Sequence, residues 1–249
     1  MEAGGGSVFV KAASTSLTAQ MVRAEMRAYE LLSLPCMAHY HGGDDDGAAP
    51  LIVIEDLGDG RWPPPWDDAL VNAVVDTLAL VHGCRAPPGL APPPAAAEGW
   101  KTVAADPRPF LALRFVSAEW LENCLGDLLS AEAGCDGGGC ALTHFDVRSD
   151  NLCLTAGGIK LVDWAEARAG NPALDTGFWL PSLAHEGGPP PEAILPDAPG
   201  VAAWVAGYFA ARAGLADIAD APRVRSIQRA QLSTALPWAA RALGLPAPY

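Results

Sequence analysis

Two short apolar segments, residues 152–154 and 159–162, flank the turn sequence TAGG. A glycine-bearing turn between two apolar runs predicts a β-hairpin. Because paired residues in a hairpin have position numbers with a constant sum, a turn centred near 156–157 brings Asn151 opposite Val162 or Asp163. We therefore expect two oxygen-bearing side chains at the open end of one hairpin, and this expectation constrains the fold more than any other feature of the chain.

A second aspartate, Asp146, lies five residues before Asn151, on the loop that enters the hairpin. Amide and carboxylate oxygens are the hard ligands that Mg²⁺ prefers, and the ion usually keeps phosphate and water in its remaining positions. An aspartate beside such an ion can orient a hydroxyl and accept its proton. These three side chains are the minimum for phosphoryl transfer from ATP to an alcohol.

The sequence HFDVRSDN, which ends at Asn151, resembles the HxDxxxxN catalytic loop of the kinase-like phosphotransferases. The sequence DWAE, which begins at Asp163, resembles their metal-binding motif, commonly DxE or DW in the aminoglycoside phosphotransferase and choline kinase relatives. The resemblance implies that Asp146 is the catalytic base and that Asn151 and Asp163 hold Mg²⁺. It also implies that His144 braces the loop and that Arg148 lies near the transferred phosphate.

A lysine, Lys11, lies in the apolar strand sequence VFVKAA of residues 8–13. In the family that the catalytic loop resembles, a strand lysine contacts the α- and β-phosphates and pairs with a helix glutamate. The predicted helix 18–34, with Thr18 as its cap and Pro35 as its stop, has an apolar stripe made of Val22, Met26, Tyr29 and Leu32. Glu25 falls inside this stripe and Glu30 nearer its edge. Because a carboxylate on a buried face needs a partner, we expect Glu25 to pair with Lys11; an ordinary surface lysine and glutamate are the alternative.

Two further segments resemble parts of the same family. Residues 51–57 (LIVIEDL) predict a strand and a hinge, where backbone groups around Glu55, Asp56 and Leu57 would meet adenine. The sequence GNPALD resembles the GxPxxD segment, and Asp175 at its end would brace the catalytic loop through a structural role.

The order of the remaining patterns predicts an α+β fold, with strands and a helix first and then mostly helices. Helices are expected over 67–82, 108–133, 200–214 and 222–243, and glycine- or proline-rich loops over 86–99, 134–139 and 187–200. The resemblance implies a protein-kinase-like fold of two lobes. Residues 1–57 would form a reduced N-terminal β lobe with the hinge, and residues 58–249 a larger helical C-terminal lobe.

The start of the chain departs from the family that it resembles. Relatives usually have two strands and a phosphate-covering loop before the lysine strand, whereas ten residues precede Lys11 here. Gly4-Gly5-Gly6 is too short to make such a hairpin, and we expect a disordered tail or a tight turn. The chain is then either truncated or naturally reduced. Either case implies weaker positioning of the nucleotide.

Composition restricts the partners. The formal net charge of −13 argues against nucleic acid and permits a cationic substrate, although ordinary solubility would explain it equally. The sequence shows neither a signal peptide nor an apolar stretch long enough to cross a membrane, which predicts a soluble cytoplasmic protein. The six cysteines are scattered, and free thiols are favoured over a metal site or disulfide at Cys135 and Cys140.

The sequence therefore predicts ATP- and Mg²⁺-dependent transfer to a hydroxyl of a small molecule. Aminoglycosides, choline-like amino alcohols and sugars fit the resemblance, and the acidic balance favours an acceptor that bears an amine. One alternative is a catalytically impaired kinase-like module that binds nucleotide or regulates a partner; another is an N-terminally truncated fragment. The oligomeric state is left open.

Overall fold

The computed structural model describes residues 7–94 and 97–249. Contacts divide the chain into two compact units, of which the first holds Met1–Pro92 with Ala141–Ala169 and the second holds Pro93–Cys140 with Gly170–Tyr249. Both units are therefore assembled from separate stretches of the chain. This division differs from the lobes 1–57 and 58–249 expected from the sequence, and that lobe boundary stays a prediction. Gly4-Gly5-Gly6 lies outside the described residues.

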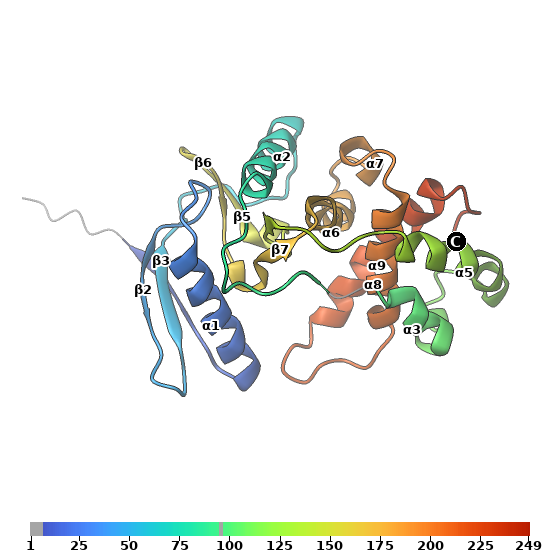
Figure 1. The fold of residues 1–249 in the computed structure, drawn as a ribbon, viewed down its shortest axis with the longest axis horizontal. Helices are drawn as coiled ribbons and strands as arrows, with labels where there is room; N and C mark the ends of the chain where they lie inside the picture. The colour runs from blue at the N-terminus through green and yellow to red at the C-terminus, as the bar shows by residue number, and fades with distance from the viewer. Residues whose placement is uncertain (1–6, 95–96) are drawn as a thin grey trace, which may run out of the picture. The chain divides into compact units, whose positions relative to one another are not determined.

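The first unit contains an antiparallel sheet of three strands in the order β1-β3-β2 (Figure 1). The strands are β1 (Val8–Ala12), β2 (Tyr40–Asp44) and β3 (Leu51–Glu55). The middle strand β3 has the sequence LIVIE, in which Ile52 and Ile54 are buried on one face. β2 was not expected from the sequence, because YHGGD lacks an apolar alternation and carries a bulge between Tyr40 and Gly42.

Helix α1 (Ser16–Leu31) contacts β1 and β3 of this sheet. Thr15 is the N-cap, so the expectation that Thr18 caps the helix was wrong. Thr18 is instead the third helical residue, and its hydroxyl completes a capping box with Thr15. After the helix ends, the Cys36 carbonyl accepts a hydrogen bond of 2.6 Å from the Leu161 amide, which ties the end of α1 to the segment that carries Asp163.

The predicted hairpin is present in the same unit. β5 (Leu152–Thr155) pairs with β6 (Gly158–Leu161), and the register places Leu152 opposite Leu161. The Val162 amide donates to the Asn151 carbonyl over 3.1 Å and extends the pairing by one residue. Asn151 therefore lies opposite Val162, the first of the two registers expected. Short 3₁₀ turns, η1 (Ser149–Asn151) and η2 (Trp164–Glu166), flank the two strands.

A second strand pair and one helix support the hairpin. β4 (Ala141–Thr143) pairs with β7 (Arg168–Gly170), and α2 (Asp68–His82) contacts β4 and β6. Asp67 caps the start of α2 and Gly83 follows its end, where the sequence predicted both boundaries. The residues of the catalytic loop therefore lie between β4 and the β5–β6 hairpin, in a small part of the unit that many hydrogen bonds hold together.

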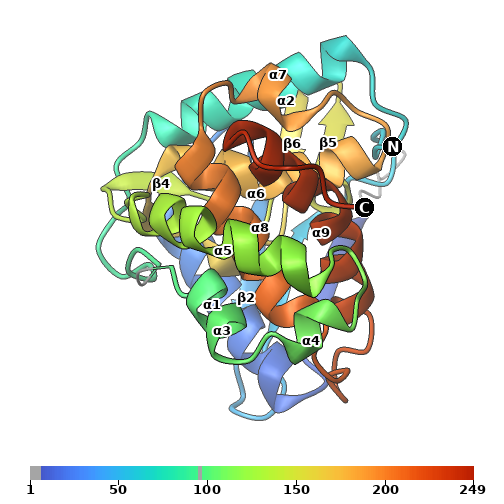
Figure 2. The same cartoon turned by 90° about the vertical axis from the view of Figure 1, so that its right-hand side faces the viewer.

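The second unit is helical. It contains α3 (Gly99–Ala105), α4 (Arg108–Leu111), α5 (Ala118–Ala133), α6 (Pro172–His185), α7 (Pro191–Ile194), α8 (Pro199–Ala213) and α9 (Val224–Ala242). Helix α8 is central, in contact with α3, α5 and α9 (Figure 2). Its sequence is almost wholly apolar with small residues, so neighbours can approach it from several sides. Within the described residues, no helix is both long and apolar enough to span a membrane.

Three expectations for this unit need correction. The helix expected over 108–133 is two helices, because the chain turns at Arg114 (φ 59°) and Ser117 then caps α5. The linker expected over 86–99 ends in the first residue of α3. The loop expected over 187–200 contains α7 and the start of α8, with proline at the first helical position in both.

Two helical glycines give opposite predictions for replacement by alanine. A Cβ at Gly126 of α5 would meet no heavy atom within 4 Å, whereas at Gly207 of α8 it would lie 2.5 Å from Glu132 and 2.7 Å from Trp100. We expect Gly126→Ala to stabilise the protein by about 0.5–1 kcal/mol through backbone entropy. Gly207→Ala should destabilise it by about 1–3 kcal/mol through overpacking. Denaturant unfolding of both variants checks this, and equal effects would contradict the packing described at α8.

Candidate active site

The carboxylate of Glu25 organises one end of the site. Glu25 is only 1% exposed, and its Oε2 accepts a hydrogen bond of 2.8 Å from the Lys11 ammonium. The backbone amide of Trp164 also donates to this carboxylate. Glu25 therefore ties strand β1 and the turn after β6 to helix α1, in the pairing with Lys11 expected from its place in the apolar stripe.

Asp163 lies beside this pair. Its Oδ1 is 2.9 Å from the Lys11 ammonium, so that Lys11 forms ion pairs with both Glu25 and Asp163. The Asp163 backbone is left-handed, with φ 62° and ψ 61°. Such a conformation costs a non-glycine residue about 1–3 kcal/mol. The neighbouring hydrogen bonds, from the Val162 amide to Asn151 and from the Trp164 amide to Glu25, hold Asp163 in this conformation.

Hydrogen bonds between its own residues hold the catalytic loop together. The Asn151 side-chain amide donates to the Asp146 carbonyl over 2.8 Å and to the Asp146 carboxylate over 3.0 Å. His144 is fully buried; its Nε2 lies 3.0 Å from the Val162 carbonyl, and its Nδ1 accepts from the Asp146 amide over 3.3 Å. His144 therefore connects the loop to the hairpin, as a bracing residue would. The Asn151 nitrogen is used on Asp146, which leaves its amide oxygen as the candidate metal ligand.

Arg148 lies between two carboxylates. Its Nε is 3.3 Å from an Asp146 oxygen, and its Nη2 donates to Asp150 over 3.1 Å. The Nε donor is buried and has no hydrogen-bond acceptor in the described part of the chain. A buried guanidinium donor beside the expected base is suited to an additional anionic acceptor, such as a phosphate oxygen.

Burial and neighbouring charges shift the pKa values of three side chains in the site. Burial raises the pKa of Asp146, and Arg148 only partly opposes it. Burial also raises the pKa of Glu25 against the opposing effect of Lys11. For Lys11, burial alone would lower the pKa, but the Glu25 and Asp163 carboxylates outweigh it and the pKa is raised. Lys11 is thus held as a cation inside a cluster of carboxylates.

The expected hinge residues follow β3 in the same unit. The Glu55 carboxylate accepts from the His39 amide over 3.0 Å, and Asp56 is exposed and accepts from the Gly58 amide over 2.9 Å. Leu57 is buried, and its carbonyl accepts from the Gly60 amide over 2.9 Å. The three residues form an ordered connection, and their role in meeting adenine stays a prediction.

Asp175 belongs to the second unit, and the six cysteines are spread over both units. Asp175 is fully buried in α6 of the second unit, and its expected role as a brace of the catalytic loop stays a prediction. All six cysteines are free thiols, including Cys135 and Cys140. The described residues contain no group of three or more His, Cys, Asp or Glu side chains that could hold a metal ion. The candidate magnesium site differs from such a group because it uses one aspartate, Asp163, and the amide oxygen of Asn151.

Sequence reasoning gave no role to the aromatic rings around the site. Trp164 is fully buried and packs edge-on against His144, with ring centroids 4.6 Å apart. Tyr29 of α1 stacks on Tyr40 of β2 at 5.3 Å. The sequence placed Tyr29 in the apolar stripe and Trp164 within the metal motif. Neither pattern indicates which other ring will pack against these two side chains. These rings fill the space between α1, the sheet and the catalytic loop.

Comparison with protein families matches residues 2–226 to the phosphotransferase enzyme family, APH. The chain belongs to this family. The match covers most of the chain, including every residue of the site described above. It agrees with the aminoglycoside phosphotransferase and choline kinase resemblance of the catalytic loop. Among curated proteins, none matches the sequence significantly.

Solved structures show the same protein-kinase-like fold. Choline kinase LicA from Streptococcus pneumoniae is similar with a TM-score of 0.59 and 14% identity, covering 98% of this chain and 88% of that one. An aminoglycoside phosphotransferase from Alicyclobacillus acidocaldarius gives a TM-score of 0.53 and 16% identity, covering 96% and 86%. The amicoumacin kinase hAmiN, solved with AMP-PNP and Ca²⁺, gives 0.54 and 14%, covering 92% and 82%. At these identities the likeness establishes the fold alone.

The Lys11–Glu25 pair predicts a dependence of stability on both partners. Lys11→Met leaves the Glu25 carboxylate buried without its cation, so we expect a loss of about 3 kcal/mol at neutral pH, near the lower end for a broken buried pair. The double variant Lys11→Met/Glu25→Met should recover part of this, because the Glu25 charge is removed while Asp163 still lacks the lysine with which it forms an ion pair. Denaturant unfolding measures both effects.

The exposed Lys101→Met serves as the control for loss of a lysine charge. The loss in Lys11→Met should shrink as the pH falls, since protonation of Glu25 removes the unpaired charge. A loss that is equal in the single and double variants would show that the ion pair is not the source.

Proposed function

We propose that this protein transfers the γ-phosphoryl group of ATP, with Mg²⁺, to a hydroxyl of a small molecule. The observation that supports the proposal most directly is the meeting of Asp146, Asn151 and Asp163 around one hairpin, with Lys11 at 2.9 Å from Asp163. Membership of the phosphotransferase enzyme family supports the same class of reaction. The relative solved with AMP-PNP and Ca²⁺ supports the use of a nucleotide and a divalent cation.

The residues present suit a magnesium ion. Asp163 offers a carboxylate, of which Oδ1 lies 2.9 Å from the Lys11 ammonium, and Asn151 offers an amide oxygen. Such hard oxygens, with phosphate and water, complete the octahedral environment that Mg²⁺ requires. When bound, the ion would neutralise charge on the transferring phosphate. In the proposed complex the Lys11 ammonium would contact the α- and β-phosphates while Glu25 keeps it in position.

The chemistry proposed for the chain's own residues is proton acceptance and positioning. Asp146 would orient the acceptor hydroxyl and take its proton as the oxygen–phosphorus bond forms and the bond to the ADP oxygen breaks. Its hydrogen bond from Asn151 fixes the carboxylate relative to the metal ligands. Arg148, with its buried Nε donor, would bind an oxygen of the transferring group. The proton on Asp146 would then pass to solvent.

The acceptor that we favour bears an amine. The formal net charge of −13 gives the protein a field that attracts cations, and both compact units share it. Choline kinase and aminoglycoside phosphotransferases among the similar structures act, by their names, on such molecules. The fold is shared by enzymes with different acceptors, so the acceptor has to be found by screening.

A second function, nucleotide binding without transfer, has one observation in its favour. Within the described residues β1 is an edge strand, and its Val8, Phe9 and Val10 are each about half exposed. No phosphate-covering segment packs on this edge in the part of the chain that the structure describes. A module of this kind would bind MgATP yet show no turnover, and it could regulate a partner.

The first test is thermal unfolding with and without MgATP. A ligand at ten times its Kd that binds only the folded protein adds about 1.4 kcal/mol, or about 3–6 °C in Tm for this size. We expect a magnesium-dependent rise in the wild type, its loss in Asp163→Ala, and its retention in Asp76→Ala, an exposed aspartate of α2. Absence of any rise at millimolar MgATP would refute the nucleotide site.

Turnover of ATP in the presence of candidate amino alcohols, aminoglycosides and sugars then separates the two functions. Asp146→Asn should lower kcat by about 10²–10⁴-fold, as loss of a general base does, and should keep the MgATP-dependent rise in Tm. Near-wild-type turnover in this variant would exclude Asp146 as the base. A Tm rise without turnover on any acceptor would favour the binding module.

The Arg148 cation predicts a pH effect on transfer. Asp146 must be ionised to act, so kcat/KM should fall as the pH drops through its pKa. Arg148 lowers that pKa, and Arg148→Gln should therefore move the acid limb of the profile to higher pH. Arg61→Gln, which removes an exposed arginine paired with Asp67, is the matched control. An unmoved limb in Arg148→Gln would show that Arg148 does not influence the base.

A further inference from the structure

A lysine that the proposed chemistry does not use lies in the hairpin. Lys160 belongs to β6, and its side chain is 19% exposed. Its ammonium donates to the Pro35 carbonyl over 3.1 Å and to the Met37 carbonyl over 2.8 Å. The Cys36 carbonyl between them accepts from the Leu161 amide. Three consecutive carbonyls of the segment after α1 therefore bind β6, two of them through Lys160.

The same ammonium reaches the end of β3. It lies 3.9 Å from the Glu55 carboxylate, an ion pair that is too long for a hydrogen bond. Glu55 is also bonded to His39, just before β2: its amide donates to the His39 carbonyl over 2.8 Å, and its carboxylate accepts from the His39 amide over 3.0 Å. Because two carbonyl groups fix the Lys160 ammonium, its attraction for Glu55 acts from a defined position.

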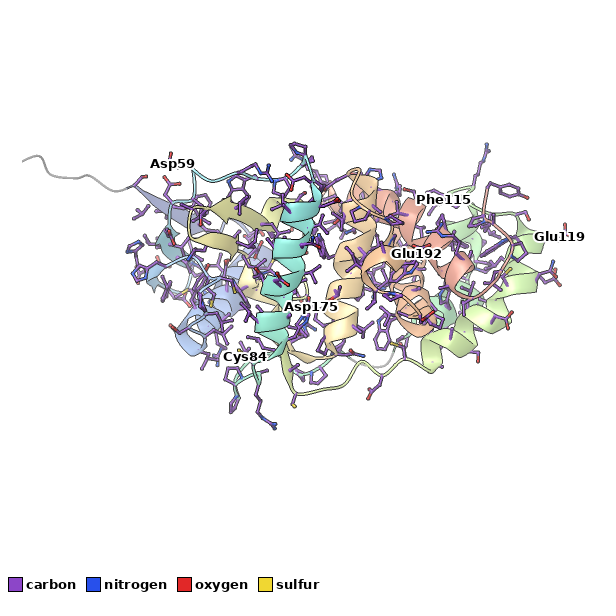
Figure 3. All side chains as sticks on the ribbon, turned by 90° about the horizontal axis from the view of Figure 1, so that it is seen from above. Asp59, Cys84, Phe115, Glu119, Asp175 and Glu192 are labelled. Atoms are coloured by element: carbon purple, nitrogen blue, oxygen red, sulfur yellow. The ribbon has the colours of Figure 1, made fainter. Side chains whose placement is uncertain are left out.

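The connection after β3 (residues 56–61) then reaches the other strand of the hairpin, β5. The Arg61 amide donates to the Leu154 carbonyl over 2.9 Å, and the Leu154 amide donates to the Arg61 carbonyl over 2.8 Å. Asp59, which Figure 3 labels, is exposed on this connection. The hairpin therefore contacts both ends of this stretch, through Lys160 at the end of β3 and through β5 at Arg61.

Two ends of the proposed nucleotide site depend on this hairpin. Asp163, the candidate metal ligand, follows Lys160 by three residues, and the base is expected to meet backbone groups of residues 55–57. A nucleotide can bind both ends at once only if the distance between them is correct. A misplacement of about 1 Å can cost an enzyme up to about 10²-fold in rate.

We propose that Lys160 is a positioning residue for the nucleotide, whose ammonium sets the distance between the base-binding end of the site and the metal-binding end. This inference rests on the proposed function. Lys160 would act through Glu55 and β6 and would touch no atom of the nucleotide. A lysine that only stabilised the fold would lower stability on removal without distinguishing the two ends of the site.

Two ligands distinguish these ends. MgATP carries the base and the phosphates, whereas magnesium tripolyphosphate carries phosphates alone. We expect Lys160→Met to raise the Kd of MgATP about tenfold, comparable to the loss of one hydrogen bond to a charged group, and to change the Kd of magnesium tripolyphosphate less than about twofold. Thermal unfolding at a series of concentrations of each ligand gives both constants for the intact protein.

Three variants control for other effects of the substitution. Lys101→Met removes an exposed lysine charge, and Gly207→Ala lowers stability by overpacking in the second unit. Both should keep the two dissociation constants of the wild type. Lys160→Arg keeps a cation with several donors, so it should recover part of the affinity for MgATP.

Two outcomes would overturn the proposal. One is an unchanged Kd of MgATP in Lys160→Met, and the other is a rise of both dissociation constants by the same factor. If tripolyphosphate binds too weakly to measure, a rise in the Kd of MgATP that Gly207→Ala matches overturns it equally. A wild type that does not bind MgATP would instead refute the proposed function itself.

Should Lys160→Met fail to fold, Glu55→Gln decides. This variant keeps an acceptor for the His39 amide and removes the charge that faces Lys160. We expect the Kd of MgATP to rise about threefold, as loss of a partly exposed ion pair would give. Asp59→Asn, on the same stretch of chain, is the matched control for loss of a carboxylate. Equal constants in Glu55→Gln and Asp59→Asn would contradict a positioning role for the ion pair.

Discussion

The burial of one carboxylate, Glu25, determines how the candidate site is built. A charge removed from water must be compensated locally, and two groups from distant parts of the chain meet this need. One is the Lys11 ammonium on β1, and the other is the Trp164 amide that follows Asp163. Because both groups must reach the same two oxygens, the lysine strand and the metal motif are brought to one place. The geometry of the site is a consequence of satisfying Glu25.

The hairpin supplies the second half of that geometry. The hydrogen-bond ladder of the hairpin sets the spacing between Asn151 and Asp163. The His144 and Trp164 rings pack against each other, and His144 contacts the Val162 carbonyl, which holds the loop that carries Asp146. The segment after α1 is joined to β6 by the hydrogen bond between the Cys36 carbonyl and the Leu161 amide. A backbone hydrogen bond therefore fixes α1 to the hairpin in addition to the interactions of the Glu25 carboxylate. The strained backbone of Asp163 persists because these contacts determine its neighbours on both sides.

Local sequence patterns and simple electrostatics were enough to predict the hairpin and the Lys11–Glu25 pair. The hairpin register followed from one turn, and the choice of Glu25 over Glu30 followed from a charge placed inside an apolar stripe. The α+β, kinase-like fold was confirmed by the family match and the similar structures. The roles of Asp146, Arg148, Asn151 and Asp163 in catalysis stay predictions, since geometry alone does not report a reaction.

The features that sequence reasoning missed depend on distant partners. Strand β2 has a glycine-rich sequence and forms because β3 offers it a ladder. Helix α3 lacks a capping residue of its own and receives one from α5. The assignment of Thr18 as the cap of α1 was a local error, because the N-cap is Thr15 and the capping box uses both residues. The ring contacts of Tyr29 and Trp164 arise only once α1 and the hairpin are in place.

The division of the chain into interleaved units has a consequence for how the protein forms during synthesis. Lys11 and Glu25 emerge early and can pair on α1, but Asp163 follows only after the stretch Pro93–Cys140, which belongs to the other unit. The ribosome adds about 5–20 residues per second, so the lysine strand waits several seconds or more for the hairpin. During that interval the first unit lacks β4 to β6, and the helices of the second unit lack α8, on which they pack. The first unit can finish once Ala169 is made, whereas the second needs the chain as far as Tyr249, so the nascent chain has to keep the second core from aggregating for longer than the first.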